Sequence, residues 1–82
     1  MFVADTYNHK IKRVGTETLT LITIAGTGEA GAQDGPTRSA TFYEPGGVSA
    51  ADGRIYVADT NNQAVRVIDL NTETVSTLDV DF

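Results

Sequence analysis

Val57–Ile68 reads VADTNNQAVRVI, and Val3–Val14, 54 positions earlier, reads VADTYNHKIKRV. The shared Val-Ala-Asp-Thr and the shared Asn indicate an internal repeat, a feature that decides the architecture before any single element is assigned. Farther along the chain, Thr16–Leu19 matches Thr72–Val75 at a displacement of 56. The two copies therefore differ by two residues in one turn, where a change of length is tolerated.

Each copy has the residue pattern of short strands joined by tight turns. Val, Ile, Thr and Tyr gather in short runs, and turn-forming residues interrupt them every ~8–12 residues, as in all-β meanders. Asp52-Gly53 is a strong hairpin signal because Gly adopts positive φ without steric cost. No segment combines a helical apolar period with a cap, so we expect no helix of consequence. The expected strands are Gly47–Ala50, Ile55–Ala58, Ala64–Asp69 and Thr74–Leu78 in the second copy, and Phe2–Asp5, Lys10–Val14 and Leu19–Ala25 in the first.

Four short antiparallel strands that recur every ~40–55 residues are typical of the blades of a β-propeller. The second copy has all four strands, whereas the first lacks the innermost one. The predicted fold class is therefore all-β: a β-propeller fragment of about two four-stranded antiparallel blades, the first without its inner strand. We divide the chain into a partial blade at 1–25, a long inter-blade connector at 26–46 and a complete blade at 47–82.

The second copy resembles the NHL repeat, which combines a Pro-x-Gly-Val strand, an Asp/Asn-Gly turn, Val-Ala-Asp-x-x-Asn and a basic residue in the next strand. The matching residues here are Pro45–Val48, Asp52-Gly53, Val57–Asn62 and Arg66. Val3–Val14 is similar to the propeller of thioredoxin-fused NHL-repeat proteins. The resemblance implies a propeller, usually of six blades, that serves mainly as a binding platform.

Two classes of function remain open. The first is a non-catalytic NHL β-propeller repeat module that acts as a protein- or ligand-binding scaffold, because repeated turns display variable side chains on a rigid frame. The alternative is a fragment of a propeller enzyme of the metal-dependent lactonase or lyase type. Such an enzyme needs several His, Asp, Glu or Asn ligands on its inner strands, and Gly47–Ala50 offers only Ser49. We therefore expect no enzyme activity, and we assign no catalytic residue, no cofactor and no metal ligand.

Composition excludes other functions. The 82 residues carry 6 basic and 11 acidic side chains, a net charge of −5, and no cysteine. The negative charge opposes binding to nucleic acid or to an anionic membrane, and the absence of cysteine excludes disulfides and thiolate chemistry. No apolar stretch approaches the length of a membrane span and no signal-peptide pattern opens the chain, so we expect a soluble protein. Since Met1 lies inside a repeat, the sequence suggests a truncated or engineered propeller.

RNA binding is a third possibility, and it would require a basic face with aromatic side chains for stacking. One local group has this character, and the rest of the chain is acidic. The group comprises Tyr7, His9, Lys10, Lys12 and Arg13.

The repeated acidic residues Asp5 and Asp59 are interpreted as turn residues. A short carboxylate at a tight turn can accept hydrogen bonds from backbone N–H groups two or more residues on. Asn8 and Asn62 are expected to end the same turns in left-handed backbone geometry, which Asn tolerates. On this interpretation Asp59→Ala costs about 1–2 kcal/mol of stability, and Gln63→Ala costs much less.

The connector contains Gly26, Gly28 and Gly31 at the spacing of a dinucleotide-binding fingerprint. That fingerprint requires a helix to open at the third Gly, whereas Asp34–Pro36 predicts a turn almost at once. We therefore interpret the segment as a blade connector, with Phe42-Tyr43 filling the gap between the blades. A ligand-binding loop is the alternative that its length leaves open.

The remaining polar residues give weak signals. His9 is the only histidine, and it is expected to be an exposed turn residue rather than a metal ligand. Asp79–Asp81 lacks the Gly and the downstream Glu of a calcium loop and is interpreted as a solvated tail. No serine lies in a Gly-x-Ser-x-Gly elbow.

The apolar pattern predicts self-association through the blade faces, with a protein partner as a further possibility. The strands of the second copy carry more apolar positions than one buried face needs, so two blades alone leave outer faces bare. Met1–Val14 has three basic residues against one acid, whereas Asp69–Phe82 has four acids and no base. Head-to-tail packing would bring the opposite charges together, and three chains would supply about six blades, with a dimer or a swapped assembly as the alternatives.

Overall fold

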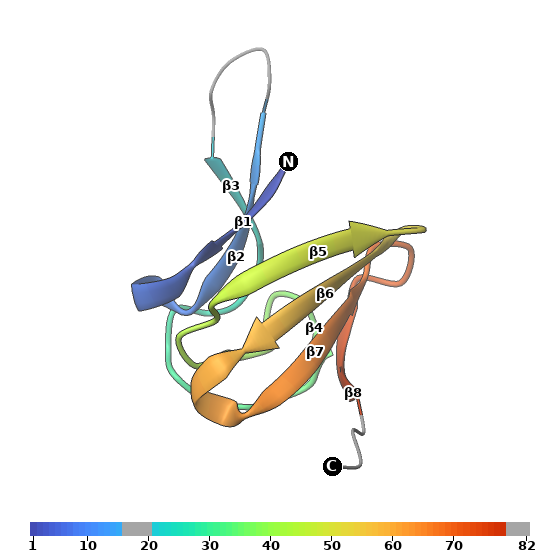
Figure 1. Ribbon diagram of the computed structural model, residues 1–82. Helices are drawn as coiled ribbons and strands as arrows, with labels where there is room; N and C mark the ends of the chain where they lie inside the picture. Colours follow the sequence, from blue (N-terminus) through green and yellow to red (C-terminus); the bar gives the residue numbers. More distant parts are fainter. Residues whose placement is uncertain (16–20, 79–82) are drawn as a thin grey trace.

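The computed structural model describes residues 1–15 and 21–78, which form two antiparallel β-sheets (Figure 1). Sheet 1 has the strand order β1-β2-β3, and sheet 2 has the order β4-β8-β7-β6-β5. Two short 3-10 helices, η1 and η2, follow β1 and β6. The bounds are β1 Phe2–Asp5, η1 Thr6–Asn8, β2 Lys10–Val14, β3 Leu21–Ala25, β4 Gly35–Pro36, β5 Gly47–Ala51, β6 Arg54–Asp59, η2 Thr60–Asn62, β7 Ala64–Asp69 and β8 Thr74–Leu78.

The strands agree with the sequence prediction in six cases to within two residues at either end. For the strand expected at Leu19–Ala25, the structure shows β3 from Leu21, and residues 19 and 20 lie outside the described part of the chain. The match at Thr16–Leu19 also lies outside it. The sequence did not predict β4, in which two residues of the connector pair with β8: Gly35 opposite Val75 and Pro36 opposite Thr74. Proline is tolerated there because β4 is an edge strand.

The internal repeat is preserved in the pairing register. Val3 lies opposite Lys12 and Lys12 opposite Thr23 in sheet 1. In sheet 2 Val57 lies opposite Arg66 and Arg66 opposite Thr77. Because side chains directly opposite one another point to the same face of a sheet, each sheet presents the same valine–cation–threonine row.

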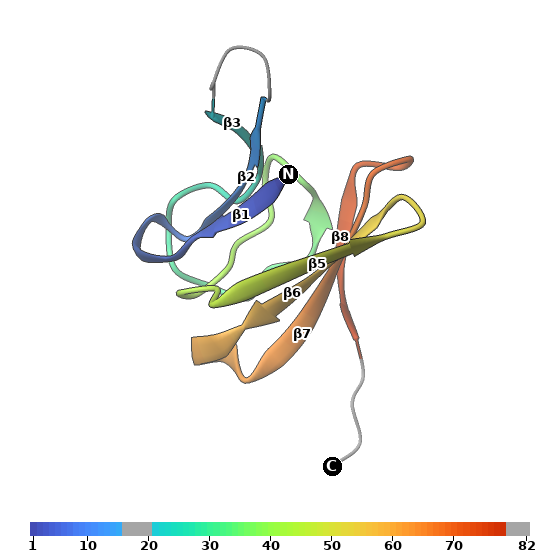
Figure 2. The ribbon, with the colours of Figure 1, turned by 45° about the horizontal axis from the view of Figure 1, so that its top comes forward.

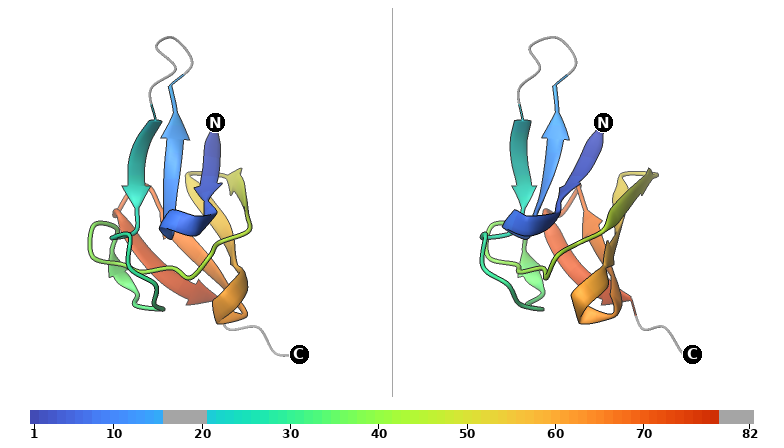
Figure 3. Two further views of the ribbon diagram at one scale, coloured as in Figure 1. Left: turned by 90° about the vertical axis from the view of Figure 1, so that its left-hand side faces the viewer. Right: turned by 60° about the vertical axis from the view of Figure 1, so that its left-hand side comes forward.

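The two sheets are blades of a β-propeller fragment, as the repeat predicts. They stack as layers, with sheet 1 in front of sheet 2 in Figure 3. Among the described residues no strand of sheet 1 corresponds to β5, the inner strand of sheet 2, and the edge strand β1 lies beside β5 (Figure 2).

The hydrophobic core forms where the two sheets and the connector meet. Ala40 and Phe42 of the connector are fully buried, which confirms that this segment fills the gap between the blades. Tyr43, expected to fill the same gap, is instead 41% exposed. The buried apolar residues are Ile11 and Ala25 of sheet 1, Ala40 and Phe42 of the connector, and Ile55, Val57, Ile68 and Val75 of sheet 2.

Candidate functional site

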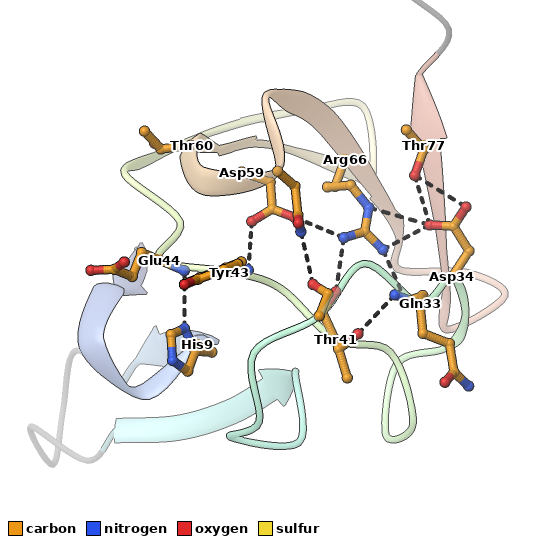
Figure 4. A network of polar contacts seen from close by, with 12 residues as sticks. His9, Gln33, Asp34, Thr41, Tyr43, Glu44, Asp59, Thr60, Arg66 and Thr77 are labelled. Carbon is orange, nitrogen blue, oxygen red and sulfur yellow. Dashed lines mark hydrogen bonds and ion pairs between the residues drawn. The ribbon is translucent and has the colours of Figure 1, made fainter.

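Arg66 of β7 is the centre of a buried polar network that ties the connector to sheet 2 (Figure 4). Its guanidinium donates to Asp34 Oδ1 from Nε at 3.2 Å and from NH2 at 2.7 Å, and to the carbonyls of Gln33 at 2.9 Å and Thr41 at 2.8 Å. A fifth bond, NH1 to Asp59 Oδ2, is 2.8 Å long. All five N–H donors of an arginine thus have acceptors.

The connector packs over this cation. The ring centroid of Phe42 lies 5.0 Å from the guanidinium carbon, within the range of a cation–π contact. Thr77 Oγ1 of β8 donates to both oxygens of Asp34, at 2.9 and 3.1 Å. No buried side-chain N or O atom among the described residues lacks a hydrogen-bond partner. The network therefore has a structural role, holding the connector against sheet 2.

Asp59 is fully buried and does not act as the turn residue that the sequence predicted. Its Oδ1 accepts from the backbone N–H of Tyr43 at 2.8 Å, and its Oδ2 accepts from Asn62 Nδ2 at 2.7 Å and from Arg66. It makes no side-chain bond to the N–H groups of η2. The local-turn interpretation was wrong because a cation seven residues on, in the paired strand, competes better for a buried carboxylate than a neighbouring amide does.

Asp5 holds the equivalent place in sheet 1 with smaller burial, its side chain being 27% exposed. Lys12 Nζ lies 2.6 Å from Oδ2, and Asn8 Nδ2 donates to the same oxygen at 3.0 Å. The hydrogen bond from Lys12, and after it the bond from Asn8, holds the pKa of the Asp5 carboxyl below its ordinary value of 3.8. Here too the turn interpretation fails, since η1 has no side-chain cap from Asp5.

The two asparagines were predicted in left-handed geometry, and this was also wrong. They lie inside η1 and η2, and the left-handed residues are the next ones, His9 at φ 57° and Gln63 at φ 52°. Asn8 and Asn62 instead donate side-chain hydrogen bonds to the aspartates three residues earlier.

His9 is half-buried rather than exposed. Its Nδ1 accepts a hydrogen bond from the backbone N–H of Glu44 at 3.0 Å, and its ring meets that of Tyr43 edge-on with centroids 5.6 Å apart. The histidine therefore joins the first turn of sheet 1 to the end of the connector. Glu44 in turn accepts from Asn61 of the second turn.

Two of the three fingerprint glycines, Gly26 and Gly31, allow close packing in this structure. A Cβ at Gly26, where φ is +101°, would lie 2.5 Å from the carbonyl oxygen of His9, and one at Gly31 would lie 2.7 Å from Thr41 Oγ1. No helix opens anywhere in residues 26–46, all of which the structure describes. The context that a dinucleotide fingerprint requires is therefore missing.

The other candidate residues are not brought together. Ser39 donates to the carbonyl of Pro36, and Ser49 and Ser76 are exposed on β5 and β8. Asp79–Asp81 lies outside the described residues. Residues 1–15 and 21–78 contain no group of three or more His, Asp or Glu that could hold a metal ion, and no helix long and apolar enough to cross a membrane.

A cleft of about 490 Å³ opens between the blades, where the end of β3 approaches the β7–β8 turn. Its charged side chains are Arg38, Asp69 and Glu73, each at least partly exposed. The remaining lining residues are Thr23, Ile24, Ala25, Gly26, Thr37 and Leu70. Since solvent-exposed groups of opposite charge line it, the cleft selects no particular ligand chemistry.

An NHL repeat family model matches residues 42–68, the span that runs from Phe42 of the connector to the end of the apolar pattern of β7. The chain belongs to the NHL-repeat family. It is 47% identical over 83 residues to NHL repeat-containing protein 2 of Bos taurus and 43% identical over 83 residues to that of Homo sapiens, covering 98% of this chain and 11% of each relative. It is also 47% identical over 72 residues to Protein SUPPRESSOR OF QUENCHING 1, chloroplastic, of Arabidopsis thaliana, covering 87% of this chain and 7% of that protein.

The chain thus spans about a tenth of the length of these NHL-repeat relatives. Sequence reasoning found the repeat but missed its buried centre, the pairing of Asp59 with Arg66. A usable signal was present, since Asp5 and Lys12 share the seven-residue spacing of Asp59 and Arg66. For Asp34, which completes the network from the connector, no repeated partner exists to reveal its role.

Proposed function

We propose that this chain is a non-catalytic NHL β-propeller module whose blade faces are its binding surfaces, and that copies of it associate face to face. The observation that carries the proposal is a difference between matched positions. Val57, Ile68 and Val75 of sheet 2 are at most 2% exposed, because sheet 1 and the connector cover them. At the register-equivalent positions of sheet 1, Val3 and Val14 are half-buried and Leu21 is 58% exposed.

The opposite face of sheet 2 offers a surface that such a face could pack against. A shallow hollow of about 320 Å³ lies there, and Tyr56, Ala58 and Val65 are among its lining residues. Leu78 on β8 is 48% exposed. Stacking the outer face of sheet 1 on this surface would repeat the arrangement that the two blades already show within the chain, and would bury apolar area on both sides.

Charge supports the same head-to-tail order. Met1–Val14 carries three basic residues and one acid, whereas Asp69–Phe82 carries four acids and no base. Head-to-tail association therefore places the basic end of one chain against the acidic end of the next, which favours this order over head-to-head contact.

The inner strand supports a module without enzymatic activity. In propeller enzymes the reacting groups converge on the central channel, and β5 presents Gly47, Val48, Ser49, Ala50 and Ala51. None of these side chains ligates a metal through a carboxylate or an imidazole.

Light scattering after size-exclusion chromatography, run over a dilution series, tests the assembly. We expect a mass above the 8.7 kDa of one chain that falls on dilution. Leu21→Asp, on the outer face of sheet 1, should shift the equilibrium to the monomer, and Leu70→Asp, in an exposed turn, is the matched control. A folded monomer at high concentration, or equal effects of the two variants, would contradict the proposal.

A further inference from the structure

The two blades carry equivalent polar triads of an Asp, an Asn and a cation, which is Arg66 in sheet 2 and Lys12 in sheet 1, and only the triad of sheet 2 is covered by the connector. Asp59 and Arg66 are fully buried under the connector and Asn62 is half-buried, whereas Asp5 and Lys12 of sheet 1 have side chains 27% and 21% exposed. The rows in which they lie share one pairing register. The contacts that the connector makes with the triad of sheet 2 therefore indicate what kind of segment the triad of sheet 1 can bind.

Three of the contacts between the connector and sheet 2 have possible counterparts in sheet 1, and two of these reach the triad (Figure 4). Asp34 places its carboxylate between Arg66 and Thr77. The backbone N–H of Tyr43 donates to the second carboxylate oxygen of Asp59. The Gly-Pro strand β4 adds to the outer edge of β8.

Each of the corresponding groups is present and available in sheet 1. Thr23 lies opposite Lys12, as Thr77 lies opposite Arg66. Both contacts of Asp5 within the described residues use Oδ2, which leaves Oδ1 for a further donor. Lys12 has three ammonium donors, and Asp5 is its one acceptor in the part of the chain that the structure describes.

The outer edge of β3 completes the match. β3 stands at one side of sheet 1 (Figure 3, left), and among the described residues no strand pairs with its outer edge. Leu21, at the position of Val75, is 58% exposed where Val75 is 2% exposed. An edge strand with unpaired backbone groups is a template for an added strand.

We propose that the β3 edge, together with Asp5, Lys12 and Thr23, is a docking site for an extended Asp-Gly-Pro segment of the connector type, supplied by another NHL repeat. We call these residues and Leu21 the connector seat. The inference deepens the proposed function, since it rests on the outer face of sheet 1 being a binding surface. In the seat, the carboxylate of the incoming Asp accepts from Lys12 and Thr23. A backbone N–H farther along the segment donates to Asp5 Oδ1, and an aromatic ring covers the ammonium group.

A synthetic peptide with the sequence of residues 30–43, acetylated and amidated at its ends, is the probe. We expect saturable binding that shifts the backbone amide NMR signals of residues 21–23. Replacing the peptide's aspartate, the equivalent of Asp34, with Asn should weaken binding about tenfold, because a charge-assisted bond is lost. A peptide of scrambled sequence is the composition control.

Three variants of the protein locate the effect. Lys12→Met should weaken binding about tenfold, whereas Arg13→Met, one residue on and therefore on the opposite face, should leave it unchanged. Lys12→Arg should tighten binding severalfold, since arginine can hold Asp5 and the peptide carboxylate at once, as Arg66 holds Asp59 and Asp34. A loss of fold in Lys12→Met cannot imitate this gain.

The seat is wrong if no saturable binding occurs at millimolar peptide, if the shifts fall on residues 74–78 instead, or if the Asn peptide binds as well as the Asp peptide. These outcomes differ from failure of the proposed assembly. A chain that stays monomeric and binds the peptide supports the seat and contradicts self-association, whereas an oligomer that ignores the peptide at every dilution contradicts the seat alone.

Discussion

Asp59→Ala and Asp5→Ala form a matched pair, because the same residue type occupies the same repeat position under different cover. Asp59 is fully buried and accepts from Arg66, Asn62 and the Tyr43 backbone. Asp5 is half-buried and accepts from two side chains. The structure therefore predicts that Asp59→Ala destabilises the chain far more than Asp5→Ala does.

The magnitude follows from the partners that remain. Breaking a buried ion pair costs about 3–5 kcal/mol, and the lower end applies here because Arg66 keeps Asp34 and two carbonyl acceptors. We therefore expect Asp59→Ala to lower the free energy of unfolding by about 3 kcal/mol, more than the ~1–2 kcal/mol expected for a turn acceptor. The total free energy of unfolding of a chain of 82 residues is roughly 4–12 kcal/mol, so this loss is a large share of the total stability.

Urea unfolding at pH 7, followed by circular dichroism, measures the difference. With a slope of about 1 kcal/mol per molar urea for a chain of this size, the midpoint of Asp59→Ala should fall by about 3 M. Should that variant be unfolded in water, the comparison is repeated in a stabilising osmolyte, where the order of the two variants is preserved. Equal midpoints for the two alanine variants, or a loss below about 1 kcal/mol for Asp59→Ala, would refute the buried network as the source of stability.

Three further predictions concern acid, backbone and core. The pKa of the Asp5 carboxyl is lower in the folded chain than in the unfolded chain, so its contribution to folding stability is present at neutral pH and is lost as the pH falls below 3.8. Asp5→Asn should therefore make the free energy of unfolding less dependent on pH in that acid range. Gly26→Ala should destabilise by about 1–3 kcal/mol through strain at positive φ and the clash with His9, whereas Gly47→Ala, with open space around it, should not; thermal unfolding compares them. Phe42→Ala should cost about 3–5 kcal/mol in urea unfolding, and a loss no larger than that of Tyr43→Ala, whose side chain is 41% exposed, would contradict its place in the core.

The strands were predictable because their signals are local. β-branched runs, an Asp-Gly hairpin and a repeated 12-residue motif each act over a few neighbouring positions, and the repeat allows one copy to check the other. The connector carried no such check. β4 has two residues and pairs with a strand that lies about forty residues away in the sequence. The dipeptide Gly35-Pro36 does not predict this pairing, because a Gly-Pro dipeptide is typical of a turn.

The polar residues were harder to interpret than the strands, since their partners lie in other elements. Asp59 was expected to bond its own turn, and it bonds a residue of the connector and a cation across the β6–β7 pair. His9 was expected to face solvent, and it accepts from Glu44, 35 residues on. A carboxylate or an imidazole bonds whatever donor the tertiary fold brings within reach, so residue type and spacing alone leave its partner undetermined.

The two copies of the motif also show that the burial of the repeated aspartate depends on the segment packed over it rather than on the motif itself. Asp5 and Asp59 have the same neighbours in sequence and the same register, yet one is half-buried and the other is fully buried. The difference arises outside the motif, in Gln33–Tyr43, which covers the triad of sheet 2 and supplies Asp34, Phe42 and the Tyr43 amide to it. In sheet 2 the cation is arginine, which can serve two carboxylates and two carbonyls together, whereas in sheet 1 the cation is lysine, with one acceptor among the described residues. At a partly exposed site the lysine ammonium group stays hydrated, whereas burying it without a partner would cost more free energy. The residue that distinguishes the two copies is therefore matched to the cover that each triad has in this structure, and the triad of sheet 1 can hold a connector without requiring one.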